Sequence, residues 1–228
     1  MAAGPKKAAQ IRLSNALGRV LVGDLRARLP KLGGAVVGER KVAGALRTTN
    51  ADVSEAHELD GLRLAVELKP INLAVGRAIW NRFGDLRTFA VNIHLKFPFA
   101  VVGGVLVIPT HEEIGTRAAA EAAEGETEIA EAGDSAESGS SPSALPDGSR
   151  PGQRSTRHLI ERAVERLIRA GGRQTEADAA HLLEGIAVVA YDPSMATIDP
   201  VLPPPGSTLR WEEFVEALAK AYEARFED

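Results

Sequence analysis

The stretch that most constrains the fold runs from Asn50 to Pro70 and has the pattern of two β-strands joined by a tight turn. The pair Asp60-Gly61 lies between two segments rich in apolar residues, which is a strong short-range signal for a β-hairpin. We therefore predict a first strand that begins at Asp52 and a second strand from Leu62 to Lys69.

Charged side chains of this hairpin are expected to meet at one place. Side chains alternate across a strand, so Glu67 and Lys69 point to one face and Leu68 to the other. If the hairpin folds Asp52 back towards Glu67, two carboxylates and one ammonium group come close together. Two carboxylate ligands suit Mg²⁺, and a neighbouring lysine can activate water or stabilise charge that builds on phosphorus. This arrangement indicates phosphodiester hydrolysis.

The identity of the first carboxylate is open between two aspartates. Asp60 also precedes Glu67, but it lies in the turn, where aspartate tolerates the backbone conformation of a type I′ turn. Asp52 is therefore the preferred candidate. The alternative for the whole set is an edge hairpin whose exposed face carries ordinary charges.

The pattern resembles the PD-(D/E)xK nuclease superfamily, to which many restriction endonucleases belong. Asp52 matches the acidic residue of the first strand, and Glu67-Leu68-Lys69 match the E-x-K of the next strand. Ala51 departs from the family, which often has proline there. The resemblance implies that Asp52, Glu67 and the main-chain carbonyl of Leu68 hold Mg²⁺, with Mn²⁺ as a substitute, while Lys69 orients the attacking water.

The resemblance also assigns roles on both sides of the hairpin. We predict a helix over residues 35–46, on which Glu39 matches the glutamate that many family members carry before the hairpin; a solvated helix charge is the alternative. We predict a longer helix over residues 71–95, capped by Asn72. Its polar side is expected to contact DNA phosphates, the alternative being an ordinary solvent-facing surface. The candidate DNA-binding residues are Arg77, Asn81, Arg82 and Arg87.

Composition narrows the class of protein. The chain has no cysteine, which excludes disulfides and thiolate metal sites, and no apolar run approaches the roughly 20 residues that span a bilayer. The amino terminus does not have the pattern of a secretory signal, and we expect a cytoplasmic protein. The net charge is −4, but residues 1–110 carry +8, residues 111–149 carry −9 and residues 150–228 carry −3. The segment with the candidate site is thus basic, as a phosphate-binding surface should be.

The remaining pattern predicts an α/β fold with a mixed central β-sheet flanked by helices. Residues 1–109 are expected to form the amino-terminal helices and nuclease core, residues 110–154 a disordered acidic and Ser-Gly-Pro-rich insertion, and residues 155–228 the part that completes the same domain. A separate carboxy-terminal helical domain is the alternative. The order matches the α-β-β-β-α-β core of the resembled nucleases apart from one missing strand, which makes the core restriction-endonuclease-like. The further expected elements are helices at 8–29, 156–170, 175–183 and 209–226, and strands at 97–109 and 185–192.

These observations lead to one functional hypothesis and two alternatives. The hypothesis is a Mg²⁺-dependent endonuclease that hydrolyses DNA, of type II restriction character and homodimeric because one site per chain must cut two strands. The alternatives are a non-catalytic DNA-binding module of the same fold and an unrelated α/β interaction protein. Motifs for nucleotide binding, zinc proteases and serine hydrolases are absent from the sequence.

Overall fold

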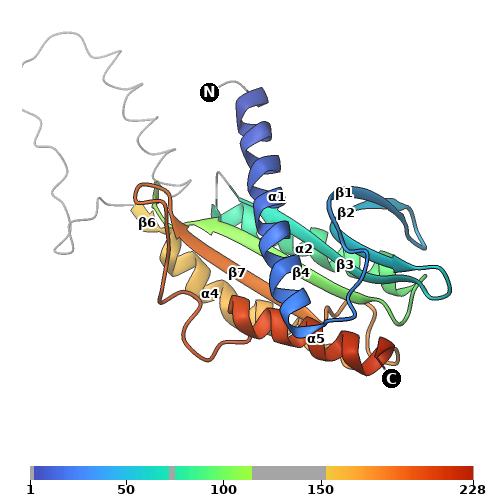
Figure 1. Ribbon diagram of the computed structural model, residues 1–228. Coiled ribbons are helices and arrows are strands. Elements are labelled where there is room, and N and C mark those ends of the chain that lie inside the picture. Colours follow the sequence, from blue (N-terminus) through green and yellow to red (C-terminus); the bar gives the residue numbers. More distant parts are fainter. Residues whose placement is uncertain (1–2, 72–74, 115–152, 228) are drawn as a thin grey trace, which may run out of the picture.

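The computed structural model describes residues 3–71, 75–114 and 153–227. These residues form a mixed six-stranded β-sheet with helices on both faces (Figure 1), which confirms the predicted α/β fold. The elements are α1 (Ala3–Arg28), β1 (Val36–Ala43), β2 (Thr48–His57), β3 (Gly61–Pro70), α2 (Val75–His94), β4 (Val101–Pro109), β5 (Glu112–Ile114), β6 (Gln153–Ser155), α4 (Thr156–Ile168), β7 (Gly185–Asp192), β8 (Thr197–Ile198) and α5 (Trp211–Phe226).

The strand order of the large sheet is β1-β2-β3-β4-β7-β8. The first three strands form an antiparallel meander, whereas β3, β4 and β7 run parallel to one another, and β8 pairs antiparallel with β7. Every residue of the central strand β4 is buried. An uninterrupted apolar segment is what a parallel strand covered on both faces requires, so the run V-V-G-G-V-L-V-I-P takes the centre of the sheet.

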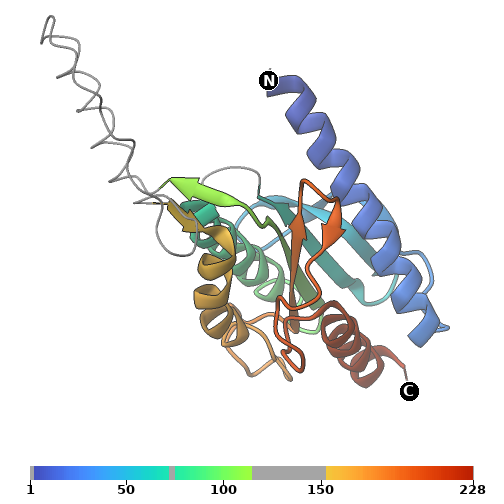
Figure 2. The same cartoon turned by 90° about the vertical axis from the view of Figure 1, so that its left-hand side faces the viewer.

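Two apolar layers cover the two faces of the sheet. Helices α2 and α4 pack on one face, where Ile79 and Leu86 are essentially inaccessible to solvent, and α1 and α5 pack on the other, where Leu21 and Phe214 are. The view in Figure 2 shows these pairs of helices on opposite sides of the sheet. Because both faces are covered, a polar site can open only near the strand ends or the edges of the sheet.

Gly103 and Gly104 lie inside β4 in regular register, not at a bulge or at the strand's start. A Cβ atom at Gly104 would lie 2.8 Å from Leu86 of α2 and 3.0 Å from Leu183. The glycine therefore allows α2 to pack directly on the central strand.

The helix predicted over residues 35–46 is wrong, because Val36–Ala43 form strand β1 and none of the remaining residues is helical. Gly38 has φ +110°, which no right-handed helix accommodates, and the register of β1 on β2 shifts between Val37 and Arg40. A short apolar segment fits a strand or a helix by periodicity alone, and pairing with β2 decides the outcome. Strand β1 is also the strand that the predicted order lacked.

The short helix predicted at residues 175–183 is also wrong, since this segment forms turns. The carboxylate of Asp178 accepts the N–H groups of Gln174 and Thr175, each at 2.9 Å. Thr175 and Asp178 have the spacing of a helix capping box, which is why a helix is predicted here. In the structure this pair closes a local turn, in which the aspartate accepts backbone N–H groups without a helix following.

The other elements agree with the sequence, with shifted ends. The first strand of the hairpin begins at Thr48 rather than Asp52, and the long helix begins at Val75, with its predicted cap Asn72 outside the described residues. Most of the predicted insertion, residues 115–152, also lies outside the described residues. The residues that flank it form β5 and β6, which pair antiparallel, and β7 beyond it joins the large sheet beside β4.

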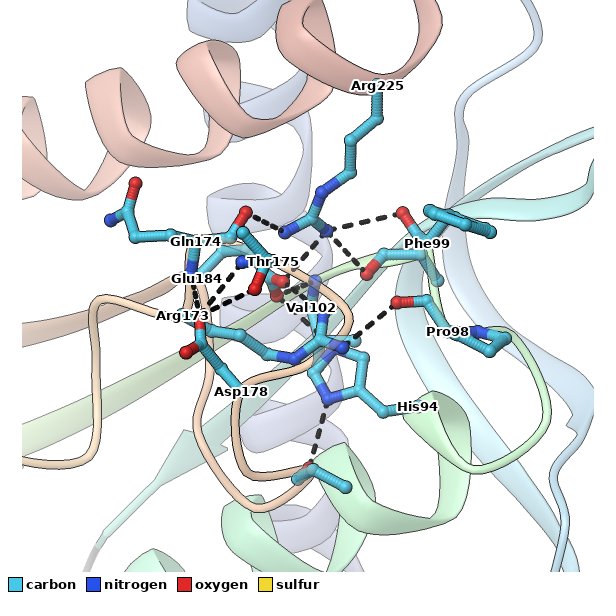
Figure 3. A network of polar contacts seen from close by, with 12 residues as sticks. His94, Pro98, Phe99, Val102, Arg173, Gln174, Thr175, Asp178, Glu184 and Arg225 are labelled. Atoms are coloured by element: carbon cyan, nitrogen blue, oxygen red, sulfur yellow. Dashed lines mark hydrogen bonds and ion pairs between the residues drawn. The ribbon is translucent and has the colours of Figure 1, made fainter.

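A buried polar cluster joins the amino-terminal ends of the parallel strands (Figure 3). One carboxylate oxygen of Glu184 lies 2.9 Å from Arg173 and 2.8 Å from Arg225, and the other accepts the N–H of Val102 at 2.7 Å and lies 3.3 Å from His94. Burial acts to raise the pKa of Glu184, but these partners outweigh it and the pKa is lowered.

The Glu184 cluster ties three elements together, because His94 ends α2, Val102 is the second residue of β4 and Arg225 belongs to the last turn of α5. It lies at the opposite end of the sheet from the carboxyl end of β3. We therefore assign the cluster to the stability of the fold rather than to the candidate site.

Candidate active site

The register of β2 on β3 places the three predicted site residues together. Val53 pairs with Val66, so the next residues along the two strands, Asp52 and Glu67, lie across from each other. Lys69 follows two positions after Glu67 on the same face and makes an ion pair with its Oε1 atom. The hairpin thus brings both carboxylates and the ammonium group to one place, as its sequence predicts.

Asp52 is held by the backbone of the neighbouring strand. The N–H of Leu68 donates a hydrogen bond to Asp52 Oδ2 at 2.7 Å. This bond connects β2 and β3 beyond the Val53–Val66 pair and holds the carboxylate beside the backbone of β3. The side chain of Leu68 is buried among the residues that face α1 and α5, on the other side of the sheet from Glu67.

The three residues line one cavity of about 550 Å³ at the carboxyl end of β3. Residues of five elements line the cavity, and most of these residues are polar. The residues that line it are Ile11, Ser14 and Asn15 of α1, Gly38 and Glu39 of β1, Asn50 and Asp52 of β2, Glu67, Leu68, Lys69 and Pro70 of β3, and Arg82 of α2.

Burial dominates the electrostatics of the two carboxylates. The side chain of Glu67 is 12% exposed, and burial raises its pKa to about 7; the charge of Asp52 adds to the rise, and Lys69 opposes it. Burial also raises the pKa of Asp52, which the Leu68 N–H and the charge of Lys69 oppose. The lysine alone does not compensate the cost of taking two carboxylates out of water.

One oxygen of this pair has no hydrogen-bond donor. Glu67 Oε2 is buried and has no hydrogen-bond partner among the described residues, whereas Oε1 is occupied by Lys69. A buried carboxylate oxygen without a partner is costly, so it suits a ligand that brings positive charge. The residues present therefore fit a divalent cation.

The number of protein ligands also bears on the kind of cation. Within the described ranges, no group of three or more histidine, aspartate or glutamate side chains is arranged to hold a metal ion. Asp52 and Glu67 are a pair, and Mg²⁺ commonly takes one or two carboxylates and completes its shell with water and substrate phosphate.

Glu39 reaches the site from a different element than the sequence suggests. It lies on strand β1, not on a helix, and it is exposed. Its Oε2 accepts a hydrogen bond from Asn50 at 3.4 Å, and its charge contributes to the raised pKa of Asp52. Glu39 therefore lines the cavity at its solvent side, although the predicted helical placement is wrong.

Asp60 lies apart from the cavity. It is in the turn between β2 and β3, pairs with Arg63 and lies 3.4 Å from His57. Its neighbour Gly61, the first residue of β3, has φ +71°, which glycine adopts at little cost, whereas Asp60 does not have a positive φ. The connection is therefore a three-residue loop over residues 58–60 and not the type I′ turn that the Asp-Gly pair predicts. The geometry favours Asp52 over Asp60 as the first acid of the site.

The four candidate DNA-binding residues of α2 divide into one that lines the cavity and three that do not. Arg82 lines it, but its guanidinium already pairs with Asp85 at 2.9 Å. The other three are exposed elsewhere on the helix, and one of them, Arg87, lies over the ring of Phe83. The other two are Arg77 and Asn81.

Sequence reasoning missed the contribution of α1 to the cavity. Ser14 and Asn15 line it, yet they lie about 40 residues before Asp52 and belong to no motif. Their signal in the sequence is a pair of polar residues within an otherwise apolar stretch of the helix. Only the packing of α1 against the sheet brings them to the site.

Comparisons of this chain with protein-family models, with curated proteins and with solved structures give no match. Among the helices of the described residues, none combines the length and the apolar character needed to cross a membrane.

Proposed function

We propose that this protein is a Mg²⁺-dependent endonuclease that hydrolyses the phosphodiester bonds of DNA, with Mn²⁺ as a possible substitute. The observation that carries the proposal is the convergence of Asp52, Glu67 and Lys69 on one cavity, with one buried oxygen of Glu67 left without a donor. Two carboxylates face this cavity, and Lys69 does not compensate both of their charges. Such a cavity suits a metal ion and a phosphate group bound to that ion.

The order of elements supports a nuclease of the PD-(D/E)xK type. From α1 to β4 the chain runs helix, strand, strand, strand, helix, strand, the α-β-β-β-α-β order of the resembled superfamily. The acid and the E-x-K lie on the second and third strands of this series. A fold does not fix a function, so the proposal depends on the side chains of the cavity.

Each residue has a distinct role in this proposal. Asp52 and Glu67 would hold the metal, which would lower the pKa of a bound water and polarise the scissile phosphate. Lys69 would position the attacking water and stabilise the charge that builds on the phosphate. Glu67 has to lose its proton before it can act as a ligand, because only the ionised carboxylate offers both oxygens.

The wider biological role follows from the substrate. We propose a restriction endonuclease of type II character that acts in the cytoplasm, where unmodified foreign DNA is met. A single site per chain cuts one strand, so two chains related by a two-fold axis would cut both strands of a duplex.

The test is incubation of the purified protein with supercoiled plasmid in Mg²⁺, in Mn²⁺ and in EDTA, followed by mapping of the product ends. We expect nicked and linear DNA with either metal and intact plasmid in EDTA. Glu67→Gln and Lys69→Ala should abolish cleavage. The melting temperature of Glu67→Gln should stay at or above that of the parent, whereas Lys69→Ala should fold with a lower melting temperature, because it removes the ion-pair partner of Glu67.

Asp60→Asn is the matched control, since it removes the same kind of charge from the same hairpin outside the cavity. It should cut as the parent does. Cleavage that survives in Glu67→Gln would come from a contaminating nuclease or from another site, and would remove this assignment. Metal-independent duplex binding without cleavage in any condition would instead favour the non-catalytic module.

A further inference from the structure

The solvent-facing side of α1 carries a regular row of arginines. Arg12, Arg19 and Arg26 follow one another at intervals of seven residues, and Ala16 and Gly23 lie between them. The spacing of three and four residues keeps all five positions on one side of the helix. All five are exposed. We refer to these residues as the arginine ridge.

Almost no acidic group of the described structure neutralises the arginines of the ridge. Within the described part of the chain, neither Arg12 nor Arg19 has an acidic partner, and Arg26 only donates to the backbone oxygen of Gly33 at 3.4 Å. The single acidic residue of α1, Asp24, accepts a hydrogen bond from the indole of Trp211 at 2.7 Å. The helix therefore presents unneutralised positive charge to solvent.

The opposite side of α1 holds the helix in place. Leu21 and Leu25 are fully buried against the sheet and α5, and Gly18 lies close to the side chains of Val37 and Val53. The apolar side is thus already used in packing. A basic amphipathic helix binds a membrane by inserting a continuous apolar side into the bilayer. Among the described side chains of α1, the large apolar ones that stay exposed are Ile11, which lines the cavity, and Val20, and these two do not form such a side.

The ridge lies beside the candidate active site. Ile11 and Asn15 of the same helix line the cavity, and at 100° per residue Arg19 and Arg12 lie roughly 40° and 60° around the helix from Asn15. Figures 1 and 2 show α1 running across the sheet, with its amino-terminal half extending beyond it. A long ligand along the ridge would therefore pass the mouth of the cavity.

We propose that the arginine ridge binds the phosphate backbone of duplex DNA and guides one strand past the cavity. Seven helical residues rise about 10.5 Å, close to the rise of three nucleotides of one strand at about 3.4 Å each. The small residues Ala16 and Gly23 leave room for the backbone between successive guanidinium groups. This inference rests on the proposed nuclease function and names the element, α1 rather than α2, that supplies most phosphate contacts.

The first test changes the ridge without removing an arginine. A Cβ atom at Gly23 would have no other atom within 4 Å beyond its own helix, and the position is exposed, so Gly23→Glu and Gly23→Gln should both fold and both favour the helix over glycine. Binding of a fluorescent 30-base-pair duplex is measured by anisotropy in EDTA, where cleavage cannot interfere. We expect Gly23→Glu to bind several-fold more weakly than Gly23→Gln.

The second test compares two triple variants with the same change in net charge. Arg12→Gln/Arg19→Gln/Arg26→Gln removes the ridge, and Arg162→Gln/Arg169→Gln/Lys220→Gln removes three exposed cations of α4, the segment after it and α5. The ridge variant should lose more than about tenfold in affinity, and its slope of log K against log salt should fall by about 2 to 3, since each phosphate contact contributes about 0.9. The control triple should remain within about twofold of the parent.

Three outcomes would overturn the inference. Equal losses in the two triple variants would show a diffuse charge effect and leave the nuclease proposal standing, because plasmid cleavage tests that independently. Absence of any duplex binding by the parent in EDTA would overturn the ridge proposal, whereas the nuclease proposal would fall only if the plasmid also stayed intact with Mg²⁺ and with Mn²⁺. Binding to anionic vesicles in preference to duplex would assign the ridge to a membrane surface.

Discussion

The raised pKa of Glu67 predicts that the metal-free protein loses stability as the pH rises. In the unfolded chain this carboxyl ionises near 4.5, and in the folded protein near 7, because burial disfavours its charged form. Between these values the folded state holds a proton that the unfolded state has released. The contribution is therefore fully present below about pH 4.5 and is lost as the pH rises through about 7.

The magnitude follows from the two pKa values. Each tenfold difference in proton affinity is worth about 1.4 kcal/mol, so the shift at Glu67 corresponds to about 3 kcal/mol of unfolding free energy between pH 4.5 and pH 7. Asp52, whose pKa is also raised, makes the unfolding free energy fall with rising pH in the same way, but by less. Glu184, with a lowered pKa, acts in the opposite direction, so the pH profile of the parent alone does not isolate Glu67.

The assay therefore compares the parent with Glu67→Gln, which keeps the shape of the side chain and cannot ionise. Urea unfolding is followed by circular dichroism in EDTA at pH 5, 6, 7 and 8. The two proteins should be about equally stable at pH 5, and the variant should be more stable by about 2 to 3 kcal/mol at pH 8.

The control for this assay is Asp60→Asn. The difference in unfolding free energy between this variant and the parent should not show the pH dependence expected for Glu67→Gln. The reasoning would be refuted if the difference in unfolding free energy between the parent and Glu67→Gln stayed constant from pH 5 to pH 8. It would mean that the carboxylate is ionised at little cost in the folded protein, and that Glu67 has no deficit of positive charge for a metal to relieve.

Three further predictions test the site and the packing around it. Addition of 10 mM Mg²⁺ or Mn²⁺ at pH 8 should raise the melting temperature of the parent and not that of Glu67→Gln, because a ligand that binds only the folded state stabilises it; an equal rise in both would place the metal elsewhere. Asp52→Ala should cost about 1 to 3 kcal/mol in urea unfolding at pH 5, where Glu67 is protonated and does not repel Asp52, because it leaves the Leu68 N–H without an acceptor; a neutral result at this pH would contradict the hydrogen bond. Gly104→Val should cost about 1 to 3 kcal/mol or more in the same measurement, since its Cβ would lie 2.8 Å from Leu86, whereas Gly84→Val, with nothing within 4 Å, should show only its helix propensity.

Local sequence determined the elements that depend on nearby residues. The Asp60-Gly61 turn, with its positive φ at Gly61, specifies the β2–β3 hairpin and so brings the E-x-K strand against the strand of Asp52. The apolar run of β4 and the amphipathic pattern of α5 likewise predict a buried central strand and a helix with one side inward. These features follow from chain chirality, turn geometry and the periods of 2 and 3.6 residues.

Tertiary structure decided the elements whose local signals were balanced. Residues 36–43 have enough apolar character for a short helix, but pairing with β2 supplies backbone hydrogen bonds that make them an edge strand, and Glu39 moves with them. Asp178 has the spacing of a helix cap and instead closes a turn before β7. In both cases the sequence offered two local solutions, and contacts from distant residues selected one.

The candidate site divides in the same way. The sequence alone predicted that Asp52, Glu67 and Lys69 come together, because a hairpin is a local structure with a fixed register. The burial that raises the pKa of Glu67, its oxygen without a donor, and the cavity wall from α1 were not. Burial and the approach of distant helices arise when both faces of the sheet are covered, which depends on the whole chain and not on any one segment of it.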